Sequence, residues 1–497
     1  MKLVFKLSVL FFYFTFLTYP QNGVRLIDFD AKSLGRGGTS IGSFDHAGLQ
    51  MTNPAGLSFL NQQVLDVNFS LMAPSLHFKN NLNDADGANN LFPLPSISYV
   101  HQYPNSKWTC GTGFFTAGGM GADFSLKHKL FVNQDGSFNA QEYHSQLATM
   151  QGGLSVAYKI SDQLSAGVSL HLVYSMLEFG MPYSLDPSVM KGTAMPGMTF
   201  GQMFAAPPSA GGFGYSEVTA LAKMSNLSAI GFNGKIGLAY KVNNDLSLGF
   251  SYTLPTSLTY KNGKASMDMT AQFNDAFGKA VMGYLAQNPS KTPAEAQAAV
   301  GAQFAGMGID LSKGVIADYN LEVELSSPQS FGFGFSYKTS DVFTLSGDIE
   351  WLNWKKAFDK MTLNLSDGSN SNINTMLGNN GTFTLDFPLL WENSVIVKLG
   401  GEYTVNNSLQ LRFGYSYGGN PVPQTTVFPV FPAIVDQHLM LGGSYKAMDM
   451  LTLHTAFEIA LSKSLEATNP SLIADEYNGS TSKLGTLLFH LGASYNF

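Results

Sequence analysis

One sequence skeleton returns five times along this chain: a tyrosine, a polar turn of five residues and an apolar residue. It reads YKISDQLSAGVSL from Tyr158, YKVNNDLSLGFSY from Tyr240 and YKTSDVFTLSGDI from Tyr337, with looser copies from Tyr403 and Tyr445. On both sides of each turn, apolar residues alternate with small or polar ones, as expected of strands that have two different faces. The repeat therefore predicts a series of β-hairpins.

The apolar face of these hairpins is rich in aromatic residues. Before the third turn, one face carries Phe331, Phe333, Phe335 and Tyr337, and the other carries Gly332, Gly334 and Ser336. A soluble β-sandwich rarely leaves Gly and Ser on the face that should form its core. A transmembrane barrel has this pattern because lipid surrounds its outer face and tyrosines line the interface. Since the chain also lacks an apolar run of about 20 residues after the N-terminus, a helical membrane bundle is excluded.

The number of strands follows from the number of turns. A sixth turn at Tyr103–Trp108 completes six hairpins, one further strand precedes them near Val64–Phe78, and the segment TLLFHLGASYNF follows them and ends at Phe497. The sequence thus predicts an all-β fold, a 14-stranded antiparallel transmembrane β-barrel. An even number of strands places both barrel ends on the periplasmic side and the long, partly helical loops outside the cell.

The N-terminus predicts export and a plug. A short basic region, an apolar run and a polar exit fit a cleaved signal peptide over residues 1–21. Residues 22–60 are too polar and Gly-rich to span lipid, so we expect them to fold into the lumen as a hatch, followed by the barrel over residues 61–497. The predicted location is the bacterial outer membrane. Its lipid and the barrel-assembly machinery, which would read Phe497, are expected partners.

Composition excludes several other functions. The net charge of −7 argues against a nucleic-acid partner. The single cysteine, Cys110, excludes a disulfide framework. LGRGGTSIG, from Leu34, lacks the G-x-G-x-x-G spacing of a dinucleotide loop, and the histidines lack metal-like spacing, so neither a cofactor nor a metal is expected. The sequence places no His beside a Ser and an acid, which indicates a protein that is not an enzyme.

The segment predicted to form the hatch resembles a known family. LGRGG at Leu34–Gly38 and FDHAGLQMTNPAGL at Phe44–Leu57 look like the N-terminal hatch of the FadL-type outer-membrane transporters (OMPP1/FadL/TodX). WLNWKKAFD from Trp351, the late PVP at Pro421–Pro423 and the terminal Phe497 also match. The resemblance implies import of long-chain fatty acids or other hydrophobic small molecules. It also implies a gate at Asn53, Pro54 and Ala55.

The third strand contains TAGGMGADF, Thr116–Phe124, in which Gly118, Gly119 and Gly121 interrupt an otherwise continuous strand. Glycine inside a strand often marks a bulge or kink. In the family that the chain resembles, a kink in the third strand opens the wall sideways below the hatch. The resemblance therefore implies capture of ligand at the extracellular loops, passage past the plug and lateral exit through this strand.

Two groups of residues are candidates for ligand binding. The two longest loops carry apolar stripes that could capture ligand, with Phe200, Met203, Phe204, Phe273 and Phe277 as the main members; packing of the loops on each other is an equal alternative. By alternation, Lys398 and Arg412 both point into the lumen. If Tyr403 opposes Leu409, Arg412 lies within two residues of the position opposite Lys398. The two cations could then pair with a fatty acid carboxylate. The inward acidic residues Asp348, Glu350, Glu402 and Glu458 make a structural salt-bridge network the stronger alternative for these two.

Two other functions remain open at this point. A general porin would use a barrel of the same kind, although it should leave its lumen open instead of filling it with about forty residues of plug. A lipid-hydrolysing enzyme embedded in a barrel would need a Ser, a His and an acid brought together, which the sequence does not place.

Overall fold

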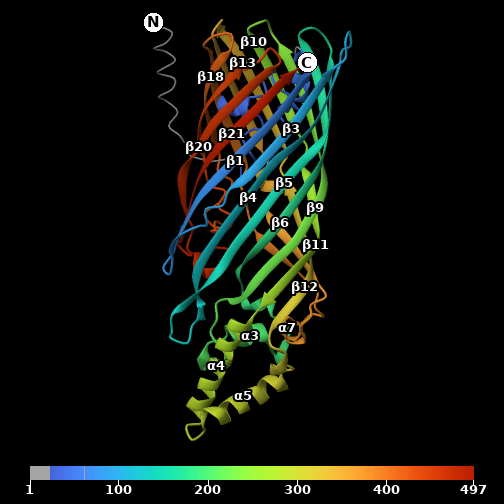
Figure 1. Ribbon diagram of the computed structural model, residues 1–497. Helices are drawn as coiled ribbons and strands as arrows, with labels where there is room; N and C mark the ends of the chain where they lie inside the picture. The colour runs from blue at the N-terminus through green and yellow to red at the C-terminus, as the bar shows by residue number, and fades with distance from the viewer. Residues whose placement is uncertain (1–22, 61) are drawn as a thin grey trace.

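The computed structural model describes residues 23–60 and 62–497 and forms one closed antiparallel β-barrel (Figure 1). The first strand, β1 (Val64–Lys79), pairs along its whole length with the last, β21 (Thr481–Asn496), which closes the sheet. The barrel has fourteen strands, as predicted. The predicted signal peptide lies outside the described residues.

Four of the fourteen strands are each built from two labelled segments. The others after β1 are β3 (Phe92–Gln102), β4 (Trp108–Val132), β5 (Phe138–Lys159), β6 (Leu164–Leu185), β9 (Val218–Lys241), β10 (Leu246–Thr253) with β11 (Thr256–Asp268), β12 (Ile316–Ser327) with β13 (Ser330–Ser340), β14 (Phe343–Leu352) with β15 (Lys360–Ser366), β16 (Phe383–Pro388) with β17 (Ser394–Thr404), β18 (Leu409–Gly418), β19 (Gln437–Lys446), β20 (Leu451–Glu466) and β21. Short pieces β2 (Asp84–Asp86), β7 (Thr193–Met195) and β8 (Met198–Thr199) lie in connections.

Proline explains two of the interruptions. Pro255 separates β10 from β11, and Pro328 separates β12 from β13. Because proline has no N–H to donate, it cannot continue a ladder of backbone hydrogen bonds. The strands are also longer than the expected ten residues: β4, β5, β6 and β9 have 25, 22, 22 and 24 residues. The long loops are therefore shorter than expected: residues 186–217 join β6 to β9, and residues 269–315 join β11 to β12.

The alternation predicted from the sequence holds in the wall. On β6, Val168, Leu170 and Leu172 are exposed on the outside, while Ser169 and His171 are buried. Phe331 and Phe333 of β13 are likewise exposed. The outer surface is thus an apolar, aromatic belt and the inner one carries small and polar side chains, as lipid contact requires.

The hatch, residues 23–60, lies inside the barrel near the end that carries the short turns and Phe497. It contains α2 (Ala31–Gly35), η1 (Ala47–Met51) and η2 (Pro54–Phe59). The Asp30 carboxylate accepts from the Lys32 and Ser33 amides and caps α2. The hatch is therefore a set of short capped turns packed on the inner face of the wall.

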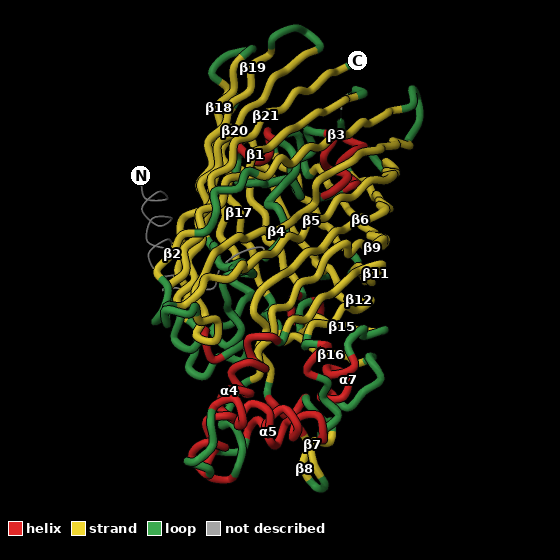
Figure 2. The backbone as a smooth tube through the Cα atoms, turned by 60° about the horizontal axis from the view of Figure 1, so that its bottom comes forward, coloured by secondary structure: helices red, strands yellow, loops and turns green. Residues whose placement is uncertain are grey.

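The other end of the barrel carries long connections (Figure 2). They include η3 (Pro187–Val189), α3 (Phe200–Ala205), η4 (Pro208–Ala210), α4 (Thr270–Gln287), α5 (Pro293–Gly306), η5 (Leu311–Lys313), α7 (Ser371–Leu377) and η6 (Asp475–Tyr477). The short helix α6 (Trp354–Ala357) instead interrupts one strand, between its segments β14 and β15. A capping box begins α5: Thr292 Oγ1 accepts from the Glu295 amide, and the Glu295 side chain accepts from the Thr292 amide. Among the residues that the structure describes, no helix is long and apolar enough to cross a membrane.

Candidate functional site

Asn53 fixes the hatch to the wall. Its amide nitrogen donates to a hatch carbonyl at 2.8 Å and to the Leu238 carbonyl of β9 at 3.0 Å, and its oxygen accepts from the Ala55 amide at 3.2 Å. A Cβ on Gly237 of β9 would lie 2.1 Å from that oxygen, so only glycine allows this approach. The structure thus places the triplet 53–55 against β6 and β9.

A different part of the wall is incomplete. Pairing between β3 and β4 ends at Ser96 and Phe115, although β4 continues to Val132. One residue further on, the register of β4 against β5 shifts between Thr116 and Gly118. The glycines predicted to kink this strand, Gly118, Gly119 and Gly121, lie in the stretch of β4 that has no β3 partner among the described residues. We call this stretch, residues 116–122, the wall gap.

The start of the hatch lies along the wall gap. The Gly119 amide donates to the Val24 carbonyl at 3.1 Å, and Arg25 forms an antiparallel bridge with Gly118. A Cβ on Gly118 would lie 2.4 Å from the Val24 carbonyl oxygen, which explains glycine at this position. The place of the missing strand is thus occupied by two hatch residues, Val24 and Arg25. They lie more than 25 residues before Asn53 in the chain.

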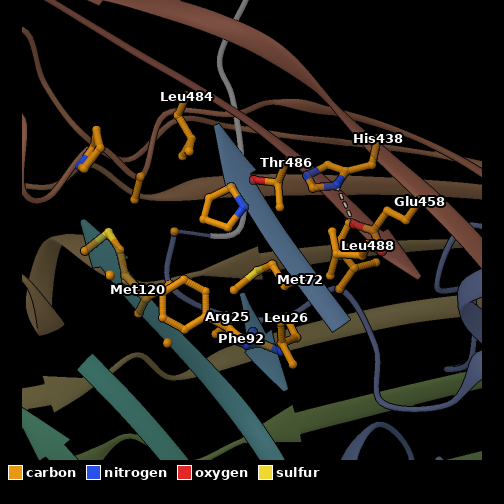
Figure 3. A pocket seen from close by; sticks show the side chains of 18 of the residues that line it. Arg25, Leu26, Met72, Phe92, Met120, His438, Glu458, Leu484, Thr486 and Leu488 are labelled. Carbon is orange, nitrogen blue, oxygen red and sulfur yellow. Dashed lines mark hydrogen bonds and ion pairs between the residues drawn. The ribbon is translucent and has the colours of Figure 1, made fainter. Parts of the chain in front are cut away.

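A cavity of about 90 Å³ lies at the wall gap, and we call it the gap cavity (Figure 3). Its lining is mostly apolar and includes Leu26, Met72, Phe92 and Met120. Thioethers and rings of this kind adapt to differently shaped hydrocarbons. Its polar end is formed by His438 and Glu458, which are joined by a hydrogen bond of 2.7 Å.

A second cavity, of about 80 Å³, shares Val24 and Arg25 with the gap cavity, and we call it the lysine cavity. It is lined by Lys235, whose side chain is buried and donates to Thr253 Oγ1 at 2.7 Å. No carboxylate lies within ion-pair distance of this ammonium in the described chain. Arg25 is 3.5 Å from Glu350, a long ion pair. A buried cation without an anionic partner is costly, so this cavity is suited to an anionic group.

Lys398 and Arg412, the cations favoured from the sequence, are buried and already paired. Lys398 Nζ lies 2.9 Å from both Glu350 Oε1 and the Ile27 carbonyl of the hatch. Arg412 Nε lies 2.6 Å from Glu402 Oε2. The structural salt-bridge network was therefore the better interpretation of their positions.

The predicted register between these strands was wrong. Tyr403 pairs with Leu411, not Leu409, so Lys398 faces Ser416 and lies four residues of register from Arg412. The reason is that the five-residue turn lies one residue further along the chain: the ladder ends at Thr404 and Gln410, so the turn is residues 405–409 and not 404–408. The two cations consequently bind different carboxylates.

The loop residues proposed for capture pack on one another. Phe200, Met203 and Phe204 of α3 are buried, and the Phe273 and Phe277 rings contact that of Phe304 at centroid distances of 5.2 and 5.8 Å. Beside them lies a cavity of about 270 Å³, the loop cavity, which is predominantly apolar. Its lining includes Tyr183, Met190, Val218, Met267, Leu377 and Phe383. None of the five loop candidates lines this cavity, and sequence alternation could not identify the residues that do.

A second segment also enters the lumen, and the sequence pattern did not predict it. Residues 419–436 join β18 to β19, and Phe428, Val430, Ile434 and Val435 are almost fully buried. We call this segment the inner loop. Phe428 stacks on Phe431 with ring centroids 6.2 Å apart, and Pro432 and Ala433 line the gap cavity. The lumen is therefore filled by the hatch from one end and by the inner loop from the other.

Glu476 joins one of the long connections to strands β4 and β5. Its carboxylate, 7% exposed, accepts from the Tyr143 hydroxyl of β5 at 2.7 Å and lies 4.0 Å from His128. Burial raises the pKa of Glu476 to about 7, and the Glu217 carboxylate contributes in the same direction. The protonated form is therefore the better fit in the folded connection.

We expect the connection over residues 467–480 to be held more tightly in acid. Because the folded pKa of about 7 exceeds the ordinary glutamate value of 4.5, the folded state retains a proton that the unfolded state loses, so stability falls as the pH rises between these values. Hydrogen exchange of this segment should accelerate over that pH window. Glu476→Gln should flatten the dependence, and an unchanged profile in this variant would contradict the assignment.

A family model described as outer membrane protein transport protein (OMPP1/FadL/TodX) matches residues 18–497. The chain belongs to this family. Its members and structural neighbours are outer-membrane transporters of hydrophobic compounds.

Solved structures share the fold of this FadL-family chain. The toluene transporter TodX of Pseudomonas putida superposes with a TM-score of 0.67 at 19% identity, covering 96% of this chain and 100% of TodX. A FadL homologue of Pseudomonas aeruginosa gives 0.68 at 17% identity, covering 96% and 100%. The toluene transporter TbuX of Ralstonia pickettii gives 0.63 at 18% identity, covering 95% and 99%.

A curated relative from Neisseria meningitidis serogroup B, described as a putative outer membrane protein, is 30% identical over 111 residues. The match spans only 22% of each chain. The family model shows the family of this chain, and the solved structures show its fold.

Proposed function

We propose that this FadL-family chain takes up hydrophobic small molecules across the outer membrane, with long-chain fatty acids as one candidate class. Ligand is captured at the extracellular loops, passes the inner loop and the hatch, and leaves sideways between β3 and β4. In this proposal the short turns, residue 64 and Phe497 face the periplasm, and the exposed aromatic belt contacts lipid. Phe497, which is 58% exposed, is available to the barrel-assembly machinery.

The interrupted pairing of β4 is the observation that carries this proposal. Backbone groups cannot face lipid unpaired, so an opening in a barrel wall requires another partner. Here Val24 supplies that partner, and an apolar cavity lies directly behind it. The first hatch residues can then act as a lateral gate: when they withdraw, the gap cavity opens toward the membrane. Asn53 holds the rest of the hatch on β9 meanwhile.

The alternatives fit the described residues less well. A general porin needs a hydrated passage, whereas here two separate segments are buried within the lumen. A hydrolase needs a nucleophile hydrogen-bonded to a base; the Ser444 and His454 side chains are in contact, but His454 also contacts Ser494, and Arg412 contacts Ser444. These polar groups satisfy one another inside the wall, so transport is the better interpretation.

Filling the gap cavity tests the lateral route. Gly121 lies beside the Phe92 ring, and a Cβ added to Gly121 would lie 2.9 Å from that ring, so Gly121→Trp should occupy the cavity. We expect uptake of a fluorescent long-chain fatty acid by cells to fall at least about tenfold, because the ligand must displace a packed indole ring. Gly278→Trp on α4, where nothing lies within 4 Å, is the matched control. Unchanged uptake with normal surface expression of Gly121→Trp would exclude the route.

A further inference from the structure

At the polar end of the gap cavity, one nitrogen of His438 has no hydrogen-bond partner in the described chain. His438 is 6% exposed, and its Nε2 is buried without a hydrogen-bond partner. Figure 3 shows the His438 ring with one nitrogen bonded to Glu458 and the other turned toward the cavity beside Thr486. Leu484 and Leu488, which also line this end, are apolar.

Neighbouring groups determine which hydrogens His438 carries. The Ser70 hydroxyl lies 2.6 Å from His490 Nδ1, and His490 Nε2 lies 3.3 Å from Glu458 Oε2. Since an ionised carboxylate only accepts, Glu458 takes N–H from His490 on one oxygen and from His438 Nδ1 on the other. Ser70 then donates to the remaining nitrogen of His490. In this arrangement each nitrogen of the two rings has a partner except His438 Nε2.

In the neutral form of the His438 ring, the free nitrogen is an acceptor. In a neutral imidazole with hydrogen on Nδ1, Nε2 carries a lone pair, and hydrogen bonding of Nδ1–H to a carboxylate makes that lone pair more basic. The preferred partner is a hydroxyl group, which can donate. A carboxylate is disfavoured at this position because it cannot donate and because Glu458 already supplies a negative charge nearby.

We propose that the gap cavity is a subsite for the hydroxyl group of a hydrophobic ligand, a phenol or an alcohol, with His438 Nε2 as the acceptor. The hydrocarbon part lies against Met72, Met120 and Phe92, and the hydroxyl donates to His438. This assignment rests on the proposed function only in that the ligand reaches the cavity from the lumen. It differs from the lysine cavity, which is suited to an anionic group.

Three probes of one shape test the assignment: p-cresol, p-xylene and p-toluate, which place a hydroxyl, a methyl or a carboxylate at the same position of a small ring. Binding to the purified full-length protein in detergent is measured by equilibrium dialysis, with protein-free micelles as the partition blank. We expect p-cresol to bind about tenfold more tightly than p-xylene, as one neutral hydrogen bond in a dry site allows.

His438→Phe keeps a ring of similar size and removes the acceptor. In this variant the preference for p-cresol over p-xylene should disappear, while the affinity for p-xylene stays the same. His171→Phe is the matched control, because His171 is also a buried lumen histidine with unpartnered nitrogens but does not line the gap cavity. Met120→Trp, which fills the cavity without changing the histidine, should weaken both neutral probes.

The outcomes separate this assignment from the transport proposal. Equal affinity for p-cresol and p-xylene in the wild type, or a preference that survives His438→Phe, would overturn the hydroxyl subsite. If His438→Phe loses the preference for p-cresol while cells that carry it still take up p-xylene, the hydroxyl subsite and the transport proposal are both supported. Absence of uptake of any probe by cells, with selective binding retained in vitro, would count against transport alone.

Discussion

Replacing Arg36 with methionine should weaken the fold of the hatch inside the barrel. Arg36 donates from both terminal nitrogens to Asp45, at 2.6 and 2.7 Å, and from Nε to the Thr39 carbonyl at 3.0 Å. Removing one partner of a fully buried pair costs about 3–5 kcal/mol, and because the Asp45 side chain is 31% exposed we expect a smaller cost here, about 2–3 kcal/mol. Glu402, 3.9 Å from Arg36, also loses part of its compensation. We expect the folded hatch to become less stable by roughly this amount.

The measurement is hydrogen exchange of residues 23–60, accompanied by single-channel conductance in planar bilayers. Exchange should accelerate by about 30- to 150-fold in Arg36→Met, since each 1.4 kcal/mol corresponds to about tenfold. The wild-type channel should stay closed, whereas the variant should show intermittent openings. The amides of the barrel strands should keep their protection from hydrogen exchange. Lys32→Met is the matched control: Lys32 contacts the same Asp45 at 2.8 Å but is more exposed, so its loss should matter much less. Equal exchange in wild type and Arg36→Met would show that the ion pair does not hold the hatch.

Acid should weaken the fold of the hatch in the wild type in the same way. Burial by itself raises the pKa of Asp45, but Arg36 and Lys32 outweigh it and hold that pKa well below its ordinary value. A group with a lowered folded pKa contributes stability above its unfolded pKa and loses it as the pH falls through the folded one. Hatch exchange should therefore accelerate only in strong acid, and Arg36→Met should shift this acceleration toward neutral pH.

The barrel could be predicted from the sequence because its determinants are local and repeated. Tyr158, Tyr240 and Tyr337 each precede a turn that the structure places at one end of the barrel, and the period-two alternation identified which side chains face outward. Each strand contains this information in about ten residues, so an error at one strand does not affect the next.

The internal contacts were harder to predict, because they depend on segments distant in sequence. Alternation correctly placed Lys398 in the lumen, but only the fold reveals that Glu350 and the Ile27 carbonyl already bind it. Lys235 obeys the same alternation as Asn233 and Gly237, so parity alone could have marked it as inward. What makes Lys235 a candidate is that no carboxylate of the described chain forms an ion pair with it. A local sequence pattern cannot show this. The inner loop was missed for a related reason: an apolar, proline-rich connection in the sequence does not indicate whether it extends outside or folds into the lumen.

Substituting Lys235 with methionine should reduce binding of anionic ligands and leave neutral ones unaffected. Methionine keeps most of the length of the side chain without its charge, and Thr253, the hydrogen-bond partner of Lys235 Nζ, can turn its hydroxyl elsewhere. A hydrogen bond to a charged group contributes about 1.5–3 kcal/mol, which corresponds to a loss of roughly ten- to a hundredfold in affinity for a fatty acid. The affinity for the corresponding methyl ester should not change. Because the variant removes an uncompensated buried cation, it should also be more stable than the wild type.

Lys241→Met is the matched control for this test. Lys241 lies six residues further along the same strand, β9, near the short turns, and its ammonium lies 4.8 Å from the centre of the Phe59 ring instead of lining a cavity. Titration of the purified protein with a fluorescent fatty acid and its methyl ester gives both affinities. A selective loss for the acid in Lys235→Met, absent in Lys241→Met, would place the carboxylate in the lysine cavity. Equal acid affinities in all three proteins would mean that Lys235 does not bind the head group. A neutral ligand would then be the better candidate for this transporter, since Lys398 and Arg412, which also point into the lumen from the wall, are already held by carboxylates of the wall.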